Sequence, residues 1–391
     1  MLGFGSNVSP VVLNKKKIIA LRLKTIVLSG FLFVCYAELL LYGLLVFFYQ
    51  GEGRLPDGMA ILGYIDTIFN MGYHYKWNFS DLNNLGIILL YSPEVWLPYA
   101  SFVINVCLLC VGWFYFSKTS SLLNVPFKYV LLVILVNSYI FYASFTPNKE
   151  TISFALYSAV AFYFIKGQFR KSLIAALILS AVRPIHSWVF VIFFGWRRPK
   201  RAILLAFFFA LCLRYLVVAS GLSGGFSGDF IENRRMFYAM YSGSYNADMF
   251  LRMFGFEASG FVLNIFEFLY NMLANMIGGF NTVRALFIND IYHPSIVAHF
   301  IQFIGSMFFF TLFCFASLIG RVRFSRRVAC LALVPLFFIS ANPFPHSRYY
   351  YPFMPLFMLW SISSLSTISV RKRNASFNPA ITGRGLLYGQ V

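Results

Sequence analysis

Three short polar islands interrupt an otherwise apolar chain, and each carries a cation. They lie at residues 147–150, 183–186 and 343–352. A guanidinium binds phosphate oxygens through two parallel hydrogen bonds, and Arg183 and Arg348 supply one each. Lys149 adds an ammonium group. Three cations around one cavity would suit an anionic substrate embedded in lipid, such as a polyprenyl phosphate or diphosphate.

Each cation also has a structural interpretation that the sequence leaves open. Arg183 could form an ion pair with Glu38 or Glu267, because a charge at membrane depth needs a partner or a cavity. Lys149 and Glu150 could be an exposed local pair that contributes little to stability. The alternative for Arg348 is an anchoring arginine within a belt of aromatic residues at a membrane boundary.

Carboxylates and histidines supply candidate acids and bases. A carboxylate could remove the proton of an acceptor hydroxyl while the cations stabilise the departing phosphate. Asp57 is the first candidate and Asp66 the second, although Asp57 lies in a Pro-Asp-Gly triplet that is also typical of a turn. His186 and His346 are further catalytic candidates, and for His186 the alternative is a packed ring bonded to a backbone carbonyl.

The composition decides which elements must position these residues. Of the 391 residues, 59% are apolar and 12% are charged, which excludes an ordinary soluble domain and indicates an all-α polytopic membrane protein. A span needs about 20 residues. Suitable runs start at Thr25, Leu97, Phe127, Thr151, Ala202, Val297, Val328 and Tyr349. Residues 172–196 and 259–280 are ambiguous, so we expect 8–10 transmembrane helices with a broken or re-entrant pair.

Lysines and arginines gather in short connections that lack acidic residues, and this bias sets the orientation. If all these connections are cytoplasmic, residues 172–196 must enter and leave on the same side. The competing topology makes both ambiguous stretches full spans. We favour the first, with both termini in the cytoplasm and the three islands at the outer face. The favoured topology divides the chain into a basic N-terminus at 1–24, one transmembrane domain at 25–370 and a disordered tail at 371–391.

Two large outer loops follow from this topology, at about residues 50–96 and 221–296. Within the first, apolar residues of the stretch 59–73 recur with helical spacing, which predicts an amphipathic helix at the membrane interface. The net charge of +19 does not indicate nucleic-acid binding, because basic residues at span ends hold orientation and meet anionic lipids. No metal site or cofactor is predicted, although Asp57 and Asp66 could bind a divalent cation.

The order of the islands resembles the GT-C superfamily of membrane glycosyltransferases, including the Wzy-type polymerases of O-antigen and capsule repeat units. The resemblance covers about residues 25–370. The first outer loop carries an acidic residue, Asp57, followed by Gly63-Tyr64. A Lys-Glu pair follows at 149–150 and an Arg-Pro at 183–184. Near the end, an Arg-Tyr precedes a Pro-x-x-Pro span at 348–355. The chain lacks the Asp-Glu doublet of many members and their large C-terminal soluble domain.

The resemblance implies an enzyme that transfers a growing glycan from polyprenyl diphosphate to the next lipid-linked repeat unit. It would act at the outer face of a bacterial inner membrane, with a chain-length regulator as a candidate partner. Tyr64, Glu150, Tyr349 and Tyr350 would contact the glycan. The alternatives are a GT-C transferase that adds one sugar from a polyprenyl phosphate, a flippase or other transporter for lipid-linked oligosaccharides, and a structural membrane subunit.

Overall fold

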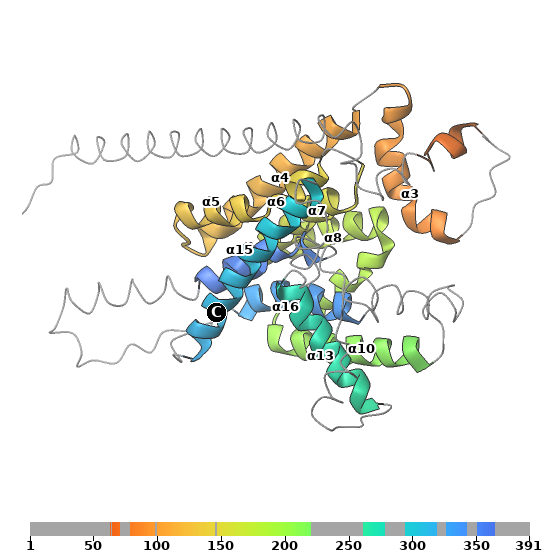
Figure 1. The fold of residues 1–391 in the computed structure, drawn as a ribbon. Helices are drawn as coiled ribbons and strands as arrows, with labels where there is room; N and C mark the ends of the chain where they lie inside the picture. The colour runs from red at the N-terminus through yellow and green to blue at the C-terminus, as the bar shows by residue number, and fades with distance from the viewer. Residues whose placement is uncertain are drawn as a thin grey trace, which may run out of the picture.

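The computed structural model describes nine parts of the chain. They are residues 63, 65–70, 79–97, 100–144, 147–219, 261–277, 294–318, 326–341 and 350–363. Within them, all regular secondary structure is helical, as Figure 1 shows, and the predicted all-α fold is confirmed. In Figure 1, α4 to α7 form the upper part of the bundle, whereas α10, α13 and α16 form the lower part.

Helices α4 (Ala100–Leu122) and α7 (Glu150–Lys166) form the best-packed pair and run in the same direction. Trp113 packs on Phe154 with ring centroids 4.5 Å apart, and further along both helices Tyr115 packs on Tyr163 at 5.5 Å. Large aromatic rings therefore fill this interface. The chain returns between the two parallel helices through α5 (Phe127–Val136) and α6 (Ser138–Ala143).

The predicted span that starts at Phe127 is broken at Asn137, which separates α5 from α6. The side chain of Asn137 donates to the carbonyl of Val133 at 2.5 Å, and its amide oxygen accepts a hydrogen bond from Gln302 at 3.0 Å. An asparagine that bonds its own backbone competes with helix continuation. Gln302 belongs to α15 (Pro294–Leu318), so the break is held in place by a neighbouring helix.

The ambiguous stretch 172–196 folds as a helical hairpin. Helix α8 (Phe169–Val182) ends before Arg183, because the residue that precedes a proline is disfavoured in the α conformation. A 3₁₀ turn, η3 (Pro184–Val189), and the short helix α9 (Phe190–Phe194) follow. The rings of Phe169 and Trp196 lie 5.0 Å apart. The stretch therefore leaves from and returns to the same end of the bundle.

Basic residues of several connections share that end, which we call the basic end. Lys171 lies over the ring of Tyr163 at 5.8 Å, and Arg327 donates to the carbonyl of Ile165 at 3.4 Å. Both contacts involve the C-terminal turns of α7. Lys149 lies at the opposite end of this 17-residue helix, about 25 Å away at 1.5 Å per residue. We call that opposite end the site end.

Three further helices complete the lower part, namely α10 (Pro199–Ala219), α13 (Phe261–Ile277) and α16 (Arg326–Ser340). Phe207 of α10 lies 5.6 Å from Phe268 and 5.5 Å from Phe337, which joins all three. The last helical segment, Met354–Ser363, is packed inside the bundle. Helix α13 occupies the second ambiguous stretch, residues 259–280.

The region predicted as the first outer loop contains more structure than the sequence indicated. Helix α3 (Phe79–Tyr91) and the 3₁₀ turn η2 (Ser92–Val95) were not predicted. Residues 65–70 are helical within the predicted amphipathic stretch, but Ile65 is buried in a small cluster with Ile87 and Tyr91. Ile65 and Ile68 thus pack against the cluster that contains α3 residues, whereas Phe69 is 42% exposed. The position of this segment at the membrane interface stays a prediction.

Length and apolar composition single out one helix among the described residues that could cross a membrane, Ala100–Leu122. Five shorter apolar helices accompany it, at Leu85–Val95, Phe127–Val136, Phe268–Ile277, Phe300–Phe315 and Met354–Ser363. The described helices nevertheless begin close to the predicted span starts at Leu97, Phe127, Thr151, Ala202, Val297 and Val328. The run from Thr25 and the terminal segments 1–24 and 371–391 lie outside the described residues.

Candidate functional site

The site end is organised around the start of α7. Asn148 precedes the helix, and its side-chain oxygen accepts a hydrogen bond from the backbone N–H of Thr151 at 2.7 Å. This bond satisfies one of the free donors that every helix N-terminus presents. The side-chain nitrogen of Asn148 donates to the carbonyl of Ala143 at 2.6 Å, which fixes the turn that connects α6 to α7.

Tyr91 and Asn105 tie α3 and α4 to the same turn. The hydroxyl of Tyr91 lies 2.5 Å from the side-chain oxygen of Asn105 and 2.9 Å from the carbonyl of Asn148. The nitrogen of Asn105 donates to the carbonyl of Ser144 at 2.9 Å. All these polar groups are buried, so the network defines the position of the first turn of α7. Lys149 and Glu150 follow directly from it.

Glu150 is buried at this turn, which excludes the interpretation of residues 149–150 as an exposed pair. One of its carboxylate oxygens accepts the backbone N–H of Lys149 at 3.1 Å. A carboxylate in the first turn of a helix is also favoured by the positive end of the helix dipole. Glu150 therefore has a structural role at the N-terminus of α7 that is compatible with a nearby polar ligand.

Arg183 extends from the end of α8 towards α7. Its backbone is extended, with φ −141° and ψ 84°, and its side chain is buried. One guanidinium nitrogen donates to the hydroxyl of Ser153 at 3.2 Å and approaches the carbonyl of Lys149 at 3.4 Å. The second island thus meets the first island, as the sequence predicted. The proposed ion pairs involve Glu38 and the side chain of Glu267, which lie outside the described part.

Ser153 connects Arg183 to His186 and fixes the form of the imidazole. Its hydroxyl donates to the carbonyl of Lys149 at 2.7 Å, so the oxygen is left to accept from Arg183 and from Nε2 of His186, which lies 3.1 Å away. With the Ser153 hydroxyl donating to Lys149, Nε2 is the protonated nitrogen of the neutral ring and Nδ1 keeps its lone pair. Nδ1 is buried and finds no hydrogen-bond partner among the described residues.

A second buried polar atom near the start of α7 also lacks a partner in the described part of the chain. This atom is Oγ1 of Thr151. Buried polar groups are normally paired, and each exception requires an explanation. The atoms on Thr151 and His186 are two of nine buried side-chain atoms that lack a partner in the described residues, and both belong to the site end.

Aromatic rings enclose His186 on its apolar sides. Phe353 and Trp188 pack edge-on against the imidazole at 5.4 and 5.5 Å. Trp188 also stacks on Phe338 of α16 at 6.1 Å and lies 5.3 Å from Phe353. Trp188 thus contacts the chain on both sides of the third island, whose residues 343–349 lie outside the described part. Phe353 and Trp188 are themselves buried, so these rings hold the imidazole of His186 in place by packing.

Asp66 lies in the same corner of the bundle as Arg183. It is exposed on the segment 65–70, and its neighbour Ile65 belongs to the small cluster against which Val182 packs. Val182 is in turn the neighbour of Arg183. The first-ranked carboxylate, Asp57, lies outside the described residues, as do Tyr64, His346, Arg348 and Tyr349.

Tyr350, a predicted glycan-binding residue that the structure describes, has surroundings that argue against that role. It is fully buried, and its hydroxyl donates to the carbonyl of Ala332 in α16 at 3.0 Å. The adjacent Tyr351 packs on Tyr139 at 4.8 Å. A ring enclosed on all sides has no face for a sugar, so we assign Tyr350 to the packing between the last segment and α16.

Four residues of the site end or its surroundings were not predicted. Ser153 lies four residues after Lys149 and so lies on the same side of a helix. This spacing in the sequence could have indicated that Ser153 belongs to the site. Asn105 and Arg214 are buried polar residues inside apolar runs, the signal that singled out Arg183. Tyr91 lies at the end of the unpredicted α3 and had no such signal. Arg214 approaches the carbonyl of Ser340 at 3.5 Å.

No family model, curated protein or solved structure matches this chain. The resemblance to GT-C enzymes consequently stays a prediction from the motifs. Within the described part, no group of three or more His, Cys, Asp or Glu side chains could hold a metal ion. What the site end offers is a buried guanidinium and an imidazole lone pair.

Proposed function

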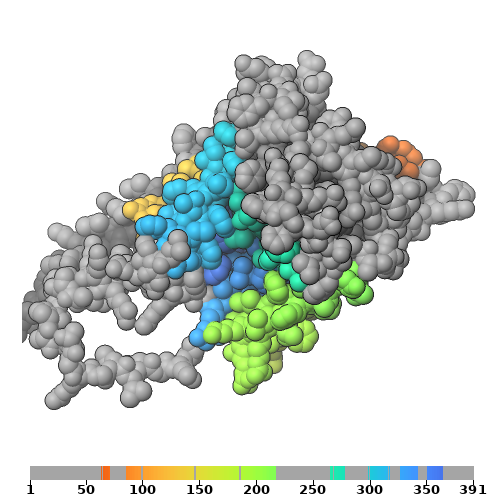
Figure 2. All heavy atoms as spheres, turned by 60° about the horizontal axis from the view of Figure 1, so that its bottom comes forward, coloured from red at the N-terminus to blue at the C-terminus, as the bar shows by residue number. Residues whose placement is uncertain are grey.

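We propose that the chain is a polytopic membrane protein, and α10 gives the main support. Its buried side carries mainly small residues and one arginine, with a single leucine: Ala202, Ala206, Ala210, Arg214 and Leu211. Its exposed side consists of large apolar residues: Leu204, Leu205, Phe208, Phe209 and Leu216. Figure 2 shows α10 (green) at the surface of the molecule. Water disfavours such a surface, whereas membrane helices pack through small residues and turn large apolar ones to lipid.

Helix α15 shows the same arrangement. Gln302 and Ser306 are buried, whereas Ile304, Phe308 and Phe315 are exposed. This reversal of the usual soluble pattern in two helices supports a hydrocarbon environment better than overall composition does. The hairpin formed by residues 172–196 supports the topology in which all basic connections lie on the cytoplasmic side.

Replacing Phe208 with arginine tests this environment. Phe208 is 59% exposed near the middle of α10, so a soluble protein would tolerate the change. In a bilayer, an arginine at the centre of a helix costs about 2.5–3.5 kcal/mol. We expect a large drop in membrane-inserted protein, measured by fractionation and immunoblotting. Leu122→Arg is the matched control, because Leu122 is 44% exposed at the basic end. Equal levels of both variants would contradict the proposal.

We further propose that the protein is a glycosyltransferase that polymerises polyprenyl-diphosphate-linked repeat units at the outer face of the membrane. The observation that carries this proposal is the buried Arg183 beside the unpaired Nδ1 of His186, at the end opposite the basic connections. Arg183 and Lys149 would bind the diphosphate. A cation in a site of low dielectric stabilises a departing phosphate strongly.

The reaction follows from these roles. The acceptor hydroxyl attacks the anomeric carbon, a new glycosidic bond forms, and the bond to the diphosphate oxygen breaks. The hydroxyl proton passes to a base. The candidate bases are Nδ1 of His186, which is buried, and the carboxylate of Asp66, which is exposed; Asp57 lies outside the described residues. The electron pair of the broken bond leaves with the polyprenyl diphosphate, whose charge Arg183 offsets.

Deletion of the coding sequence in a host that makes the polymer tests the proposed reaction. We expect complete single repeat units to accumulate on the lipid carrier, measured by mass spectrometry of lipid-linked glycans. Incomplete units, or an unmodified polymer, would instead indicate a transferase that adds one sugar. Movement of a lipid-linked oligosaccharide across liposomes without a new glycosidic bond would indicate a transporter and contradict the polymerase.

A further inference from the structure

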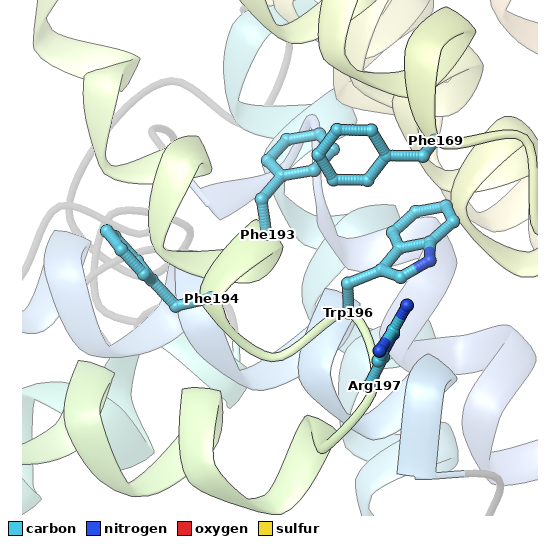
Figure 3. Close-up of a pocket in the computed structure, with 5 residues that line it drawn as sticks. All are labelled: Phe169, Phe193, Phe194, Trp196 and Arg197. Carbon is cyan, nitrogen blue, oxygen red and sulfur yellow. The ribbon is translucent and has the colours of Figure 1, made fainter.

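A hollow of about 490 Å³ opens at the basic end, far from the candidate site. It is lined by Phe169, Phe193, Phe194, Trp196 and Arg197. Figure 3 shows the rings of Phe169 and Phe193 close together next to Trp196, while Phe194 points away from them. The lining is therefore apolar except for one guanidinium. The hollow lies where the hairpin of residues 172–196 closes.

The aromatic lining is held in place from several directions. The ring of Trp196 contacts Phe169 at 5.0 Å and Phe164 at 4.8 Å, and it lies parallel to Phe193 at 6.3 Å. Arg327 of α16 lies over Trp196 at 6.0 Å. Packing from α7, α8, α9 and α16 thus fixes the walls, whereas Phe194 remains 77% exposed although it is a large apolar residue. An exposed phenylalanine at the rim indicates an apolar occupant.

The charge around the hollow has one sign. The basic residues of the surrounding connections and helix ends are Lys166, Arg170, Lys171, Arg197, Arg198, Lys200, Arg201, Arg326 and Arg327. The described ranges 163–201 and 326–341 contain no aspartate or glutamate. The N-termini of α8, α10 and α16 lie among these residues and add partial positive charge. An anion is therefore favoured and a cation is excluded.

We propose that this hollow is a binding site for an anionic phospholipid. The lipid phosphate would bind Arg197, the cation in the lining of the hollow, and part of an acyl chain would fill the space between Phe169, Phe193 and Phe194. A free phosphate or a nucleotide would use the charge but leave the aromatic lining without a partner. A basic pocket between helices at the cytoplasmic side is a known physical solution for anionic head groups. The inference rests on the membrane orientation proposed above and not on the glycosyltransferase reaction.

Purified full-length protein in nanodiscs of phosphatidylglycerol or phosphatidylcholine provides the test. We expect one phosphatidylglycerol to be retained after transfer to detergent, detected by native mass spectrometry, and a higher Tm in the phosphatidylglycerol discs. Arg197→Gln should reduce the apparent affinity for this lipid about tenfold, because it removes a charge-assisted hydrogen bond. Arg170→Gln removes an exposed charge of the same end without touching the hollow, and retention should persist.

Three outcomes would overturn the proposal. They are equal retention of phosphatidylcholine, an equal loss in Arg170→Gln and Arg197→Gln, and displacement of the lipid by millimolar inorganic phosphate alone. The last outcome would identify a simple phosphate site. Because the readout is lipid retention, its failure is distinguishable from failure of the proposed reaction, which is read from glycan chain length.

Discussion

Replacing Arg183 with glutamine should abolish long glycan chains while the protein remains in the membrane. The change removes the guanidinium that we assign to the diphosphate, and loss of one donor that stabilises developing charge typically lowers a rate about 10²–10³-fold. Glutamine keeps a polar side chain but no charge, and it is shorter than arginine, so the cost of losing the bond to Ser153 has to be measured separately. Chain length is measured by gel electrophoresis of the surface polysaccharide, normalised to protein level.

Two variants separate a chemical role of Arg183 from a structural one. Arg183→Lys keeps the charge but loses the bidentate geometry and should give partial activity. Arg214→Gln removes another buried arginine, one that also approaches a backbone carbonyl, and reports the cost of such a loss for stability alone. If both glutamine variants shortened the chains only in proportion to their protein levels, Arg183 would have no role in the reaction beyond stability.

Replacing Gly86 with alanine should have the second-largest effect, because α3 and α8 touch at this residue. A Cβ atom on Gly86 would lie 2.5 Å from the Cα of Val182 and 2.7 Å from its carbonyl oxygen. Backbone atoms cannot rotate away, so α3 or α8 must shift, at a cost of about 1–3 kcal/mol for overpacking. Val182 precedes Arg183, so we expect a lower Tm together with at least a tenfold loss of polymerisation.

Gly63→Ala is the matched control for this substitution. A Cβ atom on Gly63 would meet nothing within 4 Å, and we expect wild-type Tm and chain length. The experiment compares thermal unfolding in detergent with the polysaccharide ladder for both variants. A Gly86→Ala protein with unchanged Tm and chain length would show that α3 does not set the position of Arg183.

The sequence predicted helix positions well because crossing hydrocarbon requires long apolar runs, and such runs have visible ends. The stretch 172–196 was recognisable as a hairpin from its charges and from Pro184. The break at Asn137 was not, because a single asparagine within an apolar run is compatible with an unbroken helix. Here its side chain bonds the carbonyl of Val133 and is held by Gln302, which is far away in the chain.

The candidate site was predictable in its cations but not in its organisation. A buried Arg183 is expensive and therefore conspicuous, and its meeting with residues 147–150 followed from the topology. Ser153, by contrast, looks like any small residue of a helix until the fold brings Arg183 and His186 to its hydroxyl. Helix α3 was missed because residues 50–96 are rich in polar and aromatic residues, which gave no apolar run long enough to suggest it.

The length of α8 has a consequence for the depth at which the chemistry takes place. Its 14 residues rise about 21 Å from the basic end to Arg183, whereas the hydrocarbon slab is about 30 Å thick. With the basic end fixed at the inner boundary, Arg183 lies roughly 9 Å beneath the outer one. Under the proposed function, the diphosphate of a lipid carrier would have to descend from its usual level to reach the guanidinium. Bilayer thickness would then determine access to the proposed site, because each added methylene layer increases that descent.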